Sequence, residues 1–376
     1  MKILNLKPEP IEVFDFLNAG RRPNQFYVDQ LPVYLAEVDR LPDDLDAIVV
    51  TADLQGREEF PDRQQSDQLR LLGEVLPEML RPTLAGLGFS PGANVSAILA
   101  GDFYTYPDLR GRGGNGDVTE VWHAFADEYV WVTGVAGNHD TFGESKRMSG
   151  ARSHVKFLDE DRVELSGLKI AGLSGVIGNP KKNFRRTQDE FLAAVEKLLS
   201  SETDILVMHD GPNAPGGCKG IQEVREIVEF TRPRLVVRGH SHWPTPFVEL
   251  ANGVQVLNVD ATVVILKAGL SEATSVLTRG TMMADKLTIT GYSTALFSTW
   301  YYVDELSLLF DCGDGVASGL LQKARKIKHV FISHADRDHL GGLVQFSQLN
   351  ARQQYSSMRT GMMDESICAG WNAIKN

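Results

Sequence analysis

The chain has 376 residues, 43% of them hydrophobic and 23% charged, which excludes a disordered protein, and its length favours two structural units. A formal net charge of −11 argues against a broad nucleic-acid-binding surface. Three cysteines without a CxxC spacing argue against a disulfide framework or a thiolate zinc site, and no apolar run has the length of a signal peptide or a membrane span. We therefore expect a cytoplasmic protein with no membrane partner.

The predicted elements of an α/β domain extend from Asp46 to about Lys267, after about 45 residues to which the sequence assigns no function. Short runs rich in β-branched residues alternate there with amphipathic stretches. Five predicted strands end in a polar residue: DAIVVTAD at Asp53, VSAILAGD at Asp102, YVWVTGVAGN at Asn138, DILVMHD at Asp210 and LVVRGH at His240. Helices are predicted at Gln65–Leu80, Thr119–Asp127, Thr187–Leu199 and Ile221–Phe230, the third opening with a Thr187–Glu190 capping box.

The pattern changes after Leu266, where strand periodicity is lost. An alternating pattern resumes near Asp285 and indicates a β-meander. The predicted organisation is a first domain over residues 1–268, a linker over 269–284, a second segment over 285–350 and a weakly ordered tail over 351–376. The sequence does not predict an oligomeric state.

Side chains that bind metals collect at the predicted strand ends. Open α/β sheets bind ligands beyond the carboxyl ends of their strands, so these residues would meet at one place. Carboxylate, amide and imidazole groups together suit divalent iron, manganese or zinc. The set comprises Asp53 and Gln55 in TADLQGR, Asp102 in LAGDF, Asn138 and His139 in AGNHD, His209 in VMHDG, and His240 and His242 in RGHSH.

The motif order DxQ, GD, GNHD, H and GHSH resembles that of the calcineurin-like metallophosphoesterase family over about 220 residues. The resemblance implies an α/β fold in which a β-sandwich is flanked by helices, the αββα arrangement. It also implies two divalent metal ions bridged by Asp102. The other implied ligands are Asp53, Gln55 and His242 for the first ion and Asn138, His209 and His240 for the second.

The sequence departs from the family pattern at Gln55, where most members have His. A neutral amide oxygen is a weaker ligand than imidazole, so we favour manganese, a harder ion, over iron or zinc. Two metal ions acidify a bound water and clamp the phosphoryl group, which predicts attack by a metal-bound hydroxide. The resemblance implies that His139 protonates the leaving group or stabilises the transition state. Asp140 would orient the imidazole, and a structural role is the alternative for each of the two.

Cations near the motifs are candidate residues for binding a small phosphorylated substrate. Arg57 follows the first motif, and the stretch GNPKKNFRRT carries Lys181, Lys182, Arg185 and Arg186. Arginine suits phosphate contacts, whereas a basic run beside a helix start is also typical of a solvated surface. The glycine-rich residues 110–117 form either a lid or a surface loop.

A second motif lies in FISHADRDHLGGL, which contains His334, Asp336, Asp338 and His339. Together with LLFDCGDG, it resembles the front part of a metallo-β-lactamase domain, nearest to ribonuclease Z-like members, over about 70 residues. Asp336 stands where the usual pattern has a second His, and no histidine follows His339. We expect an incomplete, β-rich segment that holds one metal ion weakly at most.

The sequence favours a hydrolase that acts on a phosphomonoester or phosphodiester in a small nucleotide-like or phosphoprotein substrate. A nuclease acting on RNA or DNA is one alternative, and the acidic net charge weighs against it. A degenerate phosphoesterase scaffold that binds without catalysis is another, because of Gln55.

Overall fold

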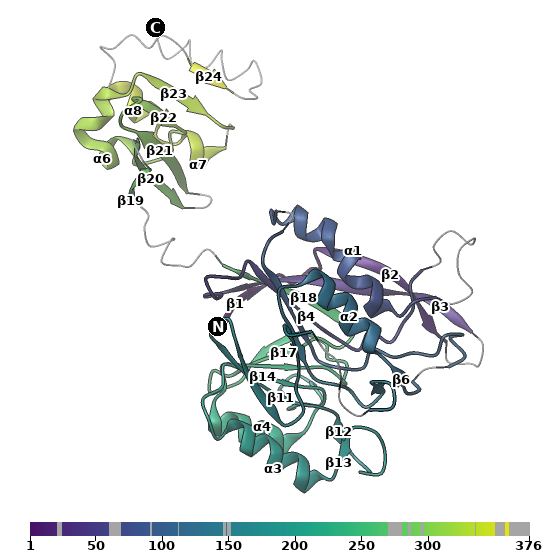
Figure 1. Ribbon diagram of the computed structural model, residues 1–376. Coiled ribbons are helices and arrows are strands. Elements are labelled where there is room, and N and C mark those ends of the chain that lie inside the picture. The colour runs from purple at the N-terminus through teal and green to yellow at the C-terminus, as the bar shows by residue number, and fades with distance from the viewer. Residues whose placement is uncertain are drawn as a thin grey trace. The chain divides into compact units, whose positions relative to one another are not determined.

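The computed structural model describes residues 1–20, 25–59, 69–90, 92–111, 113–145, 148, 152–269, 280–284, 287–294, 297–334, 336–349 and 358–360. The chain forms two compact units, Met1–Gly269 and Leu270–Asn376 (Figure 1). Among the described residues, no helix is both long enough and apolar enough to cross a membrane.

The first unit is built on two sheets. The larger has eight strands in the order β1-β3-β18-β4-β5-β7-β9, with β2 paired to β3. Strands β4, β5, β7 and β9 are parallel, and β18 pairs antiparallel with β4. The strands are β1 (Ile3–Leu6), β2 (Glu12–Ala19), β3 (Phe26–Val38), β4 (Ala47–Ala52), β5 (Val95–Leu99), β7 (Val132–Gly134), β9 (Val155–Phe157) and β18 (Thr262–Ala268).

The second sheet has six strands in the order β10-β11-β14-β15-β17-β16, of which β11, β14, β15 and β17 are parallel. These strands are β10 (Asp161–Leu165), β11 (Leu168–Leu173), β14 (Ile205–Met208), β15 (Leu235–Arg238), β16 (Phe247–Glu249) and β17 (Gln255–Asn258). Two short ladders pair β6 (Gly116–Asp117) with β8 (Asp140–Thr141) and β12 (Val176–Ile177) with β13 (Arg185–Arg186).

Alternating side chains along the strands hold the layers together. In β4, Ala47 and Val49 pack in the core shared with the first two helices, whereas Ile48 and Val50 pack in the core between the two sheets. A third core lies between the second sheet and the last two helices. The predicted helix–sheet–sheet–helix arrangement is therefore confirmed. Its helices are α1 (Leu72–Gly86), α2 (Thr119–Glu128), α3 (Gln188–Leu199) and α4 (Gln222–Thr231).

Three of these helices, α2, α3 and α4, lie where the sequence predicts them. The capping box of α3 is present, because the Glu190 N–H donates to Thr187 Oγ1 and the Glu190 carboxylate accepts from the Thr187 N–H. The first helix was predicted from Gln65, and it begins later, at Leu72. Residues 60–68 lie outside the described residues. The preceding turn is fixed because the Leu72 N–H donates to the Gly56 carbonyl.

The first 45 residues, to which the sequence assigned no function, form the edge of the larger sheet. Strands β2 and β3 pair antiparallel from Glu12–Val33 to Ala19–Phe26. Strand β3 then pairs parallel with β18, near the end of the first unit. This region is consequently part of the sheet that carries the first metal-binding motifs.

The second unit holds a six-stranded sheet in the order β19-β20-β21-β22-β23-β24. The predicted linker contains β19, residues 270–279 lie outside the described residues, and β24 lies within the predicted weakly ordered tail, most of which is likewise outside them. The fold is thus an αββα domain followed by a second, β-rich unit. Its elements are β19 (Gly280–Ala284), β20 (Leu287–Thr294), β21 (Ser298–Val303), β22 (Leu308–Phe310), α6 (Val316–Leu320), the 3₁₀ helix η1 (Leu321–Lys326), β23 (His329–Ile332), α7 (Arg337–Leu340), α8 (Leu343–Leu349) and β24 (Met358–Thr360).

Candidate metal centre

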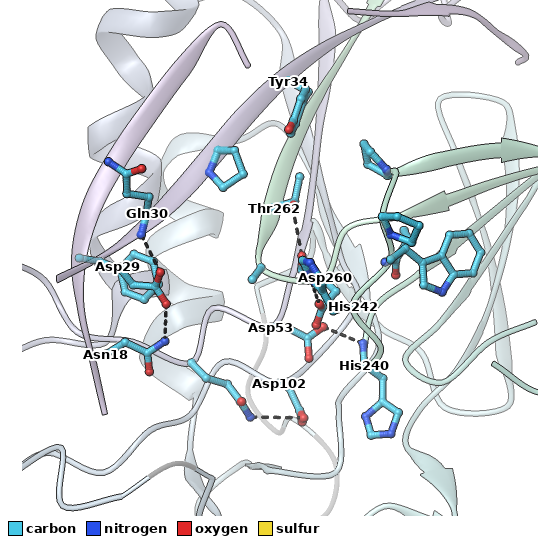
Figure 2. Close-up of a pocket in the computed structure, with 18 of the residues that line it drawn as sticks. Asn18, Asp29, Gln30, Tyr34, Asp53, Asp102, His240, His242, Asp260 and Thr262 are labelled. Carbon is cyan, nitrogen blue, oxygen red and sulfur yellow. Dashed lines mark hydrogen bonds and ion pairs between the residues drawn. The ribbon is translucent and has the colours of Figure 1, made fainter. Parts of the chain in front are cut away.

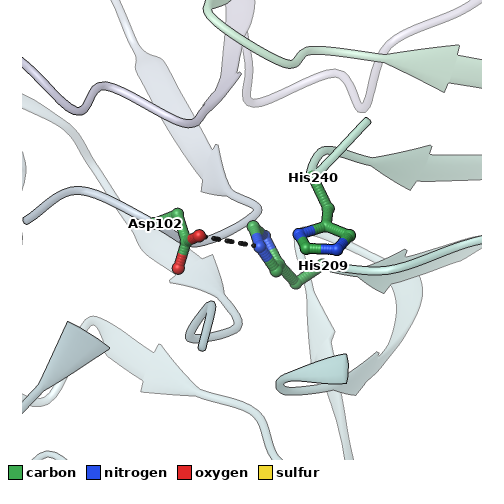
Figure 3. Close-up of side chains that lie close together, drawn as sticks. All are labelled: Asp102, His209 and His240. Carbon is green, nitrogen blue, oxygen red and sulfur yellow. Dashed lines mark ion pairs between the residues drawn. The ribbon is translucent and has the colours of Figure 1, made fainter. Parts of the chain in front are cut away.

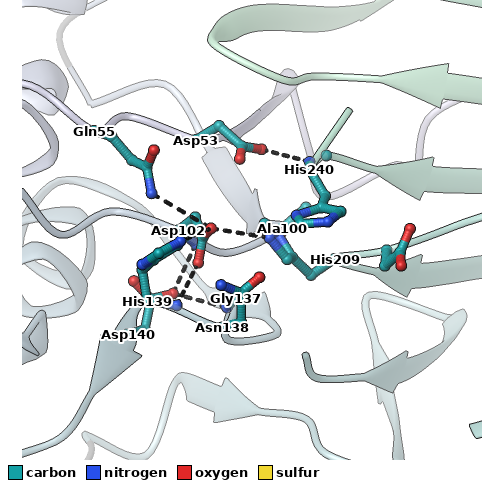
Figure 4. A network of polar contacts seen from close by, with 12 residues as sticks. Asp53, Gln55, Ala100, Asp102, Gly137, Asn138, His139, Asp140, His209 and His240 are labelled. Atoms are coloured by element: carbon teal, nitrogen blue, oxygen red, sulfur yellow. Dashed lines mark hydrogen bonds and ion pairs between the residues drawn. The ribbon is translucent and has the colours of Figure 1, made fainter. Parts of the chain in front are cut away.

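The polar residues at five strand ends converge on one edge of the two sheets (Figure 4). Asp53, Asp102 and Asn138 follow β4, β5 and β7 of the larger sheet, and His209 and His240 follow β14 and β15 of the second. The backbone is left-handed at three of them, with φ of 56° at Asp53, 57° at Asp102 and 68° at His240. Such strain in residues other than glycine persists where the surrounding structure enforces it, and it is common at functional sites.

The centre of this arrangement is a group of three side chains whose ligand atoms lie within 4.8 Å of one another: Asp102, His209 and His240 (Figure 3). His209 Nε2 lies 3.2 Å from Asp102 Oδ2, and the His209 and His240 ring centroids are 5.0 Å apart. Carboxylate and imidazole groups so arranged form a site suited to a divalent metal ion.

Two buried atoms of the site have no hydrogen-bond partner among the described residues, His209 Nε2 and Asn138 Oδ1. The His209 ring is oriented by its other nitrogen, because Nδ1–H donates to the Ala100 carbonyl at 2.8 Å. This backbone contact is typical of histidines that bind a metal through the opposite nitrogen. A buried imidazole nitrogen that faces the Asp102 carboxylate, and a buried amide oxygen without a hydrogen-bond partner among the described residues, therefore fit divalent metal ions here.

Asp53 and Gln55 flank this group (Figure 4). The His240 N–H donates to Asp53 Oδ2 at 2.8 Å, which ties the first motif to the GHSH motif. Gln55 Nε2 lies 3.4 Å from Asp102 Oδ2. A half-turn of the Gln55 amide would instead direct its oxygen to the same place, so Gln55 is positioned to act as an amide ligand.

His242 lies apart from the three-residue group. Its side chain is 87% exposed, and Nδ1 is 3.3 Å from Asp260 Oδ2. A carboxylate on one ring nitrogen leaves the other free to bind a metal ion. Asp260 was not predicted from the sequence, although it follows β17 just as the other polar residues follow their strands.

His139 is held by the glycine-rich loop and not by Asp140. Its Nδ1 donates to the Gly114 carbonyl at 2.6 Å, since a carbonyl oxygen only accepts. Nε2 is then directed toward Asp102, at 3.9 Å from Oδ2. Asn115 of the same loop donates to the Asn138 carbonyl. The part of residues 110–117 that the structure describes is thus anchored to the site.

The predicted role of Asp140 as the group that orients the imidazole does not match its contacts. Its carboxylate is fully buried and accepts from the backbone N–H groups of Asp102, Phe103 and Gly137 at 2.7–2.8 Å. Burial raises the pKa of Asp140 to about 6, and the negative charge of Asp102 adds to the rise. Asp140 therefore shapes the loops that carry Asp102 and Asn138.

Two motif glycines allow the close approach of these loops. A Cβ on Gly137 would lie 1.9 Å from Asp102 Oδ1, and a Cβ on Gly239 would lie 2.3 Å from Asp53 Oδ2. No side chain fits at either position without displacing a carboxylate of the site.

The charges of the site favour a cation. Burial raises the pKa of Asp53 well above its ordinary range, opposed by His209 and reinforced by Asp260. Burial also acts to raise the pKa of Asp102, but His209 and His139 outweigh it and the pKa falls. Burial acts to lower the pKa of His209, but Asp102 and Asp53 raise it above its ordinary value. A positive charge between these carboxylates is therefore stabilised.

The five candidate substrate cations lie outside the cavity at this site. Arg57 is buried, and its terminal nitrogens donate to the Leu69 and Thr105 carbonyls at 2.6 Å. Arg186 donates to the Ser174 carbonyl and to Asp159. Arg57 and Arg186 thus connect segments of the fold. Of the remaining three, Lys181 and Lys182 are exposed and Arg185 is half-buried.

The cavity has a volume of about 690 Å³ and is lined from three directions (Figure 2). The metal-site residues lie on one side, the segment around Trp243 and Asp260 on the second, and strands β2 and β3 on the third. The contribution of β2 and β3 was missed, because their role depends on pairing with β18 and no local motif reveals it. Asn18, Asp29, Gln30 and Tyr34 are the polar residues that these strands supply.

Comparison with protein families gives two matches. The calcineurin-like phosphoesterase family matches residues 47–244, which hold the whole candidate metal centre. The chain belongs to the calcineurin-like phosphoesterase family. The metallo-beta-lactamase superfamily matches residues 293–353. Both resemblances seen in the sequence are thereby confirmed, and membership of the first family implies divalent metal ions at the centre.

The chain is also similar to solved structures. The protein TT1561 of Thermus thermophilus has 16% identity and a TM-score of 0.38 over 63% of this chain and 93% of that one. The sulfate thiohydrolase SoxB of Thermus thermophilus, in complex with glycerol, has 12% identity and a TM-score of 0.31 over 70% of this chain and 57% of that one. A cold-active protein-tyrosine phosphatase of a psychrophilic Shewanella species has 12% identity and a TM-score of 0.26 over 75% of this chain and 97% of that one. Comparison with curated proteins gave no match.

The motif of the second unit forms a compact polar cluster. His339 Nδ1 lies 2.8 Å from Asp311 Oδ2, and its Nε2 lies 3.3 Å from Asp338 Oδ2. His334 Nε2 lies 3.3 Å from Asp336 Oδ2, and the two histidine rings are 3.9 Å apart. Among the described residues, the one set of three side chains with ligand atoms within 4.8 Å of one another is in the first unit.

Proposed function

We propose that this chain hydrolyses phosphate esters at a dinuclear metal centre in its first unit. The observation that carries the proposal is the convergence of Asp102, His209 and His240 from separate strands, together with a buried Asn138 Oδ1 that has no hydrogen-bond partner among the described residues. The residues that would hold the ions are Asp53, Gln55, Asp102, Asn138, His209, His240 and His242. When bound, two divalent ions supply an activated water and neutralise the charge of the phosphoryl group.

His139 supplies the proton for the leaving group in this proposal. Because Nδ1–H is engaged by the Gly114 carbonyl, the imidazolium form is the one that can donate from Nε2. That nitrogen belongs to a half-buried ring that lines the cavity, where the ester oxygen would be bound.

Gln55 and Asn138 would supply neutral oxygen ligands, while Asp53 and Asp102 supply charged ones. Hard oxygen ligands favour manganese among the candidate ions, so manganese is the proposed native metal. Asp140 contributes by holding the backbone of Asp102 and Gly137, which sets the separation between the loops that carry Asp102 and Asn138.

Refilling metal-stripped protein separately with manganese, iron or zinc tests the proposal. Turnover of p-nitrophenyl phosphate and bis(p-nitrophenyl) phosphate would be measured with the number of metal ions per chain. Turnover with close to two ions is the expected result, highest with manganese. No turnover with any metal, or full activity of the metal-stripped protein, would contradict the proposal.

A further inference from the structure

The cavity beside the metal-site residues has room for more than a phosphoryl group. Its volume of about 690 Å³ lies within the range of about 300–1,000 Å³ that holds whole small-molecule ligands. Strands β2 and β3 form the wall opposite the segment around Asp260 (Figure 2). The organic part of a bound ester therefore has a defined wall to contact.

No lysine or arginine occurs among the described residues that line this cavity. Asp29 and Asp260 add negative charge to the lining instead. A monoester dianion or a polyphosphate would be neutralised by the metal ions and the His139 imidazolium, and the carboxylates elsewhere in the lining would repel it. A diester, with a single negative charge, fits this lining better.

Asp29 presents a carboxylate that is hydrogen-bonded but has no cationic partner among the described residues. Its Oδ2 accepts from Asn18 Nδ2 and from the Tyr27 hydroxyl, both at 2.9 Å, and its Oδ1 accepts from the Gln30 N–H at 3.0 Å. A carboxylate has about four acceptor positions, so one remains for a ligand. Among the described residues, no basic nitrogen lies within the 4.0 Å of an ion pair with Asp29.

A second acceptor without a partner lies in the same lining. Asn258 is 4% exposed, and its Nδ2 donates to the Ser241 carbonyl at 3.0 Å. Its Oδ1 has no hydrogen-bond partner among the described residues. Gln30 Nε2 is likewise engaged, by Asp15, which leaves the Gln30 oxygen as an acceptor. The lining thus has acceptors that lack donors, and a ligand that brings donors would satisfy them.

We propose that the wall of β2 and β3 binds a hydrogen-bond donor, a hydroxyl or an ammonium group, at the end of the second ester group of a phosphodiester. Asp29 accepts from that donor, and Asn18 and Tyr27 hold the carboxylate in place. The proposal rests on the phosphoesterase function proposed above and adds the substrate class.

Matched p-nitrophenyl alkyl phosphates test this proposal on the manganese-loaded full chain. The alkyl groups are propyl, 3-hydroxypropyl and 3-aminopropyl, and a second series has five-carbon chains for a longer reach. We expect kcat/KM to be about 10- to 100-fold higher for a donor-bearing ester than for its alkyl counterpart. Comparison of the hydroxyl and amino esters distinguishes the two donors.

Two variants and one control locate the effect. Asp29→Asn keeps the shape of the side chain and removes its charge, so the preference for the donor-bearing ester should fall toward one. Gln30→Ala should reduce the same preference less. Glu12→Gln, which makes the same charge change on the exposed part of β2 outside the cavity, should leave the preference unchanged.

Three results would overturn the proposal. They are equal kcat/KM for donor-bearing and alkyl esters at both chain lengths, an unchanged preference in Asp29→Asn, and faster turnover of p-nitrophenyl phosphate than of every diester. If no ester is hydrolysed at all, the phosphoesterase proposal fails as well. Hydrolysis of the propyl ester without any preference would overturn the subsite alone.

Discussion

The two units arrange their candidate metal-binding side chains in different ways. In the first, Asp102, His209 and His240 come from the ends of three strands in two sheets, so they reach a common point from separate directions. In the second, the candidate residues lie on one short segment that runs from His334, after β23, to His339 in α7, and Asp311 after β22 joins them. Both histidines of that segment pair with a neighbouring carboxylate, His334 with Asp336 and His339 with Asp338. A metal centre thus depends on the convergence of strands more than on a local motif.

Removing the proposed bridging carboxylate of the first unit should have the largest effect. Asp102→Ala should reduce turnover to background, beyond the roughly 10- to 100-fold loss that removal of an outer-shell partner causes. Asp311→Ala makes the equivalent change in the second unit and should leave turnover unchanged. The measurement is kcat/KM with metal counted per chain. Similar losses in the two variants would show that both units serve one reaction.

His139→Ala should have the next largest effect. Loss of a general acid lowers kcat by about 100- to 10,000-fold, while metal content stays at the wild-type value because His139 is not a proposed ligand. The matched control is His339→Ala in the second unit, for which kcat should not change. If His139→Ala loses metal, the residue is a ligand or supports one.

Deleting the second unit should have a small effect on activity. A chain ending at Gly269 retains every proposed ligand and all three cores of the first unit, so its kcat/KM should stay within about twofold of the full chain. Metal content and thermal unfolding would be measured on both proteins. An inactive truncated chain that still melts cooperatively would show that the second unit contributes to the site.

His334→Ala in the full chain should leave the metal content unchanged. Its Nε2 pairs with Asp336, and its ring lies against His339. These candidate ligands all come from one segment of the chain, so they would surround a metal ion on one side only. Elemental analysis after dialysis gives the metal count. A loss of one ion per chain would establish a second metal centre, located in the second unit.

Labelling of two buried thiols should measure the unfolding of each unit separately. Cys218 lies in the first unit and Cys312 in the second, and burial raises the pKa of both thiols, that of Cys312 to about 12, where Asp311 adds to the rise. Only the thiolate reacts, so at pH 8 each should resist a thiol reagent until its unit opens. Labelling through a denaturant series, in a Cys368→Ser background, should give two separate transitions. Rapid labelling of either residue in native buffer would show that its unit is open.

Much of the fold was predictable, because the strands of a buried parallel sheet are continuous apolar runs that end at a polar residue. Asp53, Asp102 and His240 could be placed at strand ends by that pattern alone. The edge formed by β2 and β3 was not predictable, since β3 pairs with β18, more than 200 residues later, and that pairing leaves no local mark.

The residues around the centre were predictable only in part. Sequence proximity suggested Arg57 as a phosphate ligand, but its contacts are with the carbonyls of Leu69 and Thr105, which no motif links to it. Asp140 adjoins His139 in sequence, yet its side chain binds backbone N–H groups of other loops. Proximity along the chain identified these residues, and only the three-dimensional structure shows which partner each one has.

The left-handed backbone at Asp53, Asp102 and His240 implies a conflict between activity and thermal stability. Holding a residue other than glycine in this region costs on the order of 1–3 kcal/mol. Glycine adopts the same conformation without that cost, so replacing Asp102 with glycine would relax the chain while removing a proposed ligand. Selection for heat resistance alone would therefore favour inactive proteins at these three positions, and a search for stabilised variants must keep turnover as a second criterion.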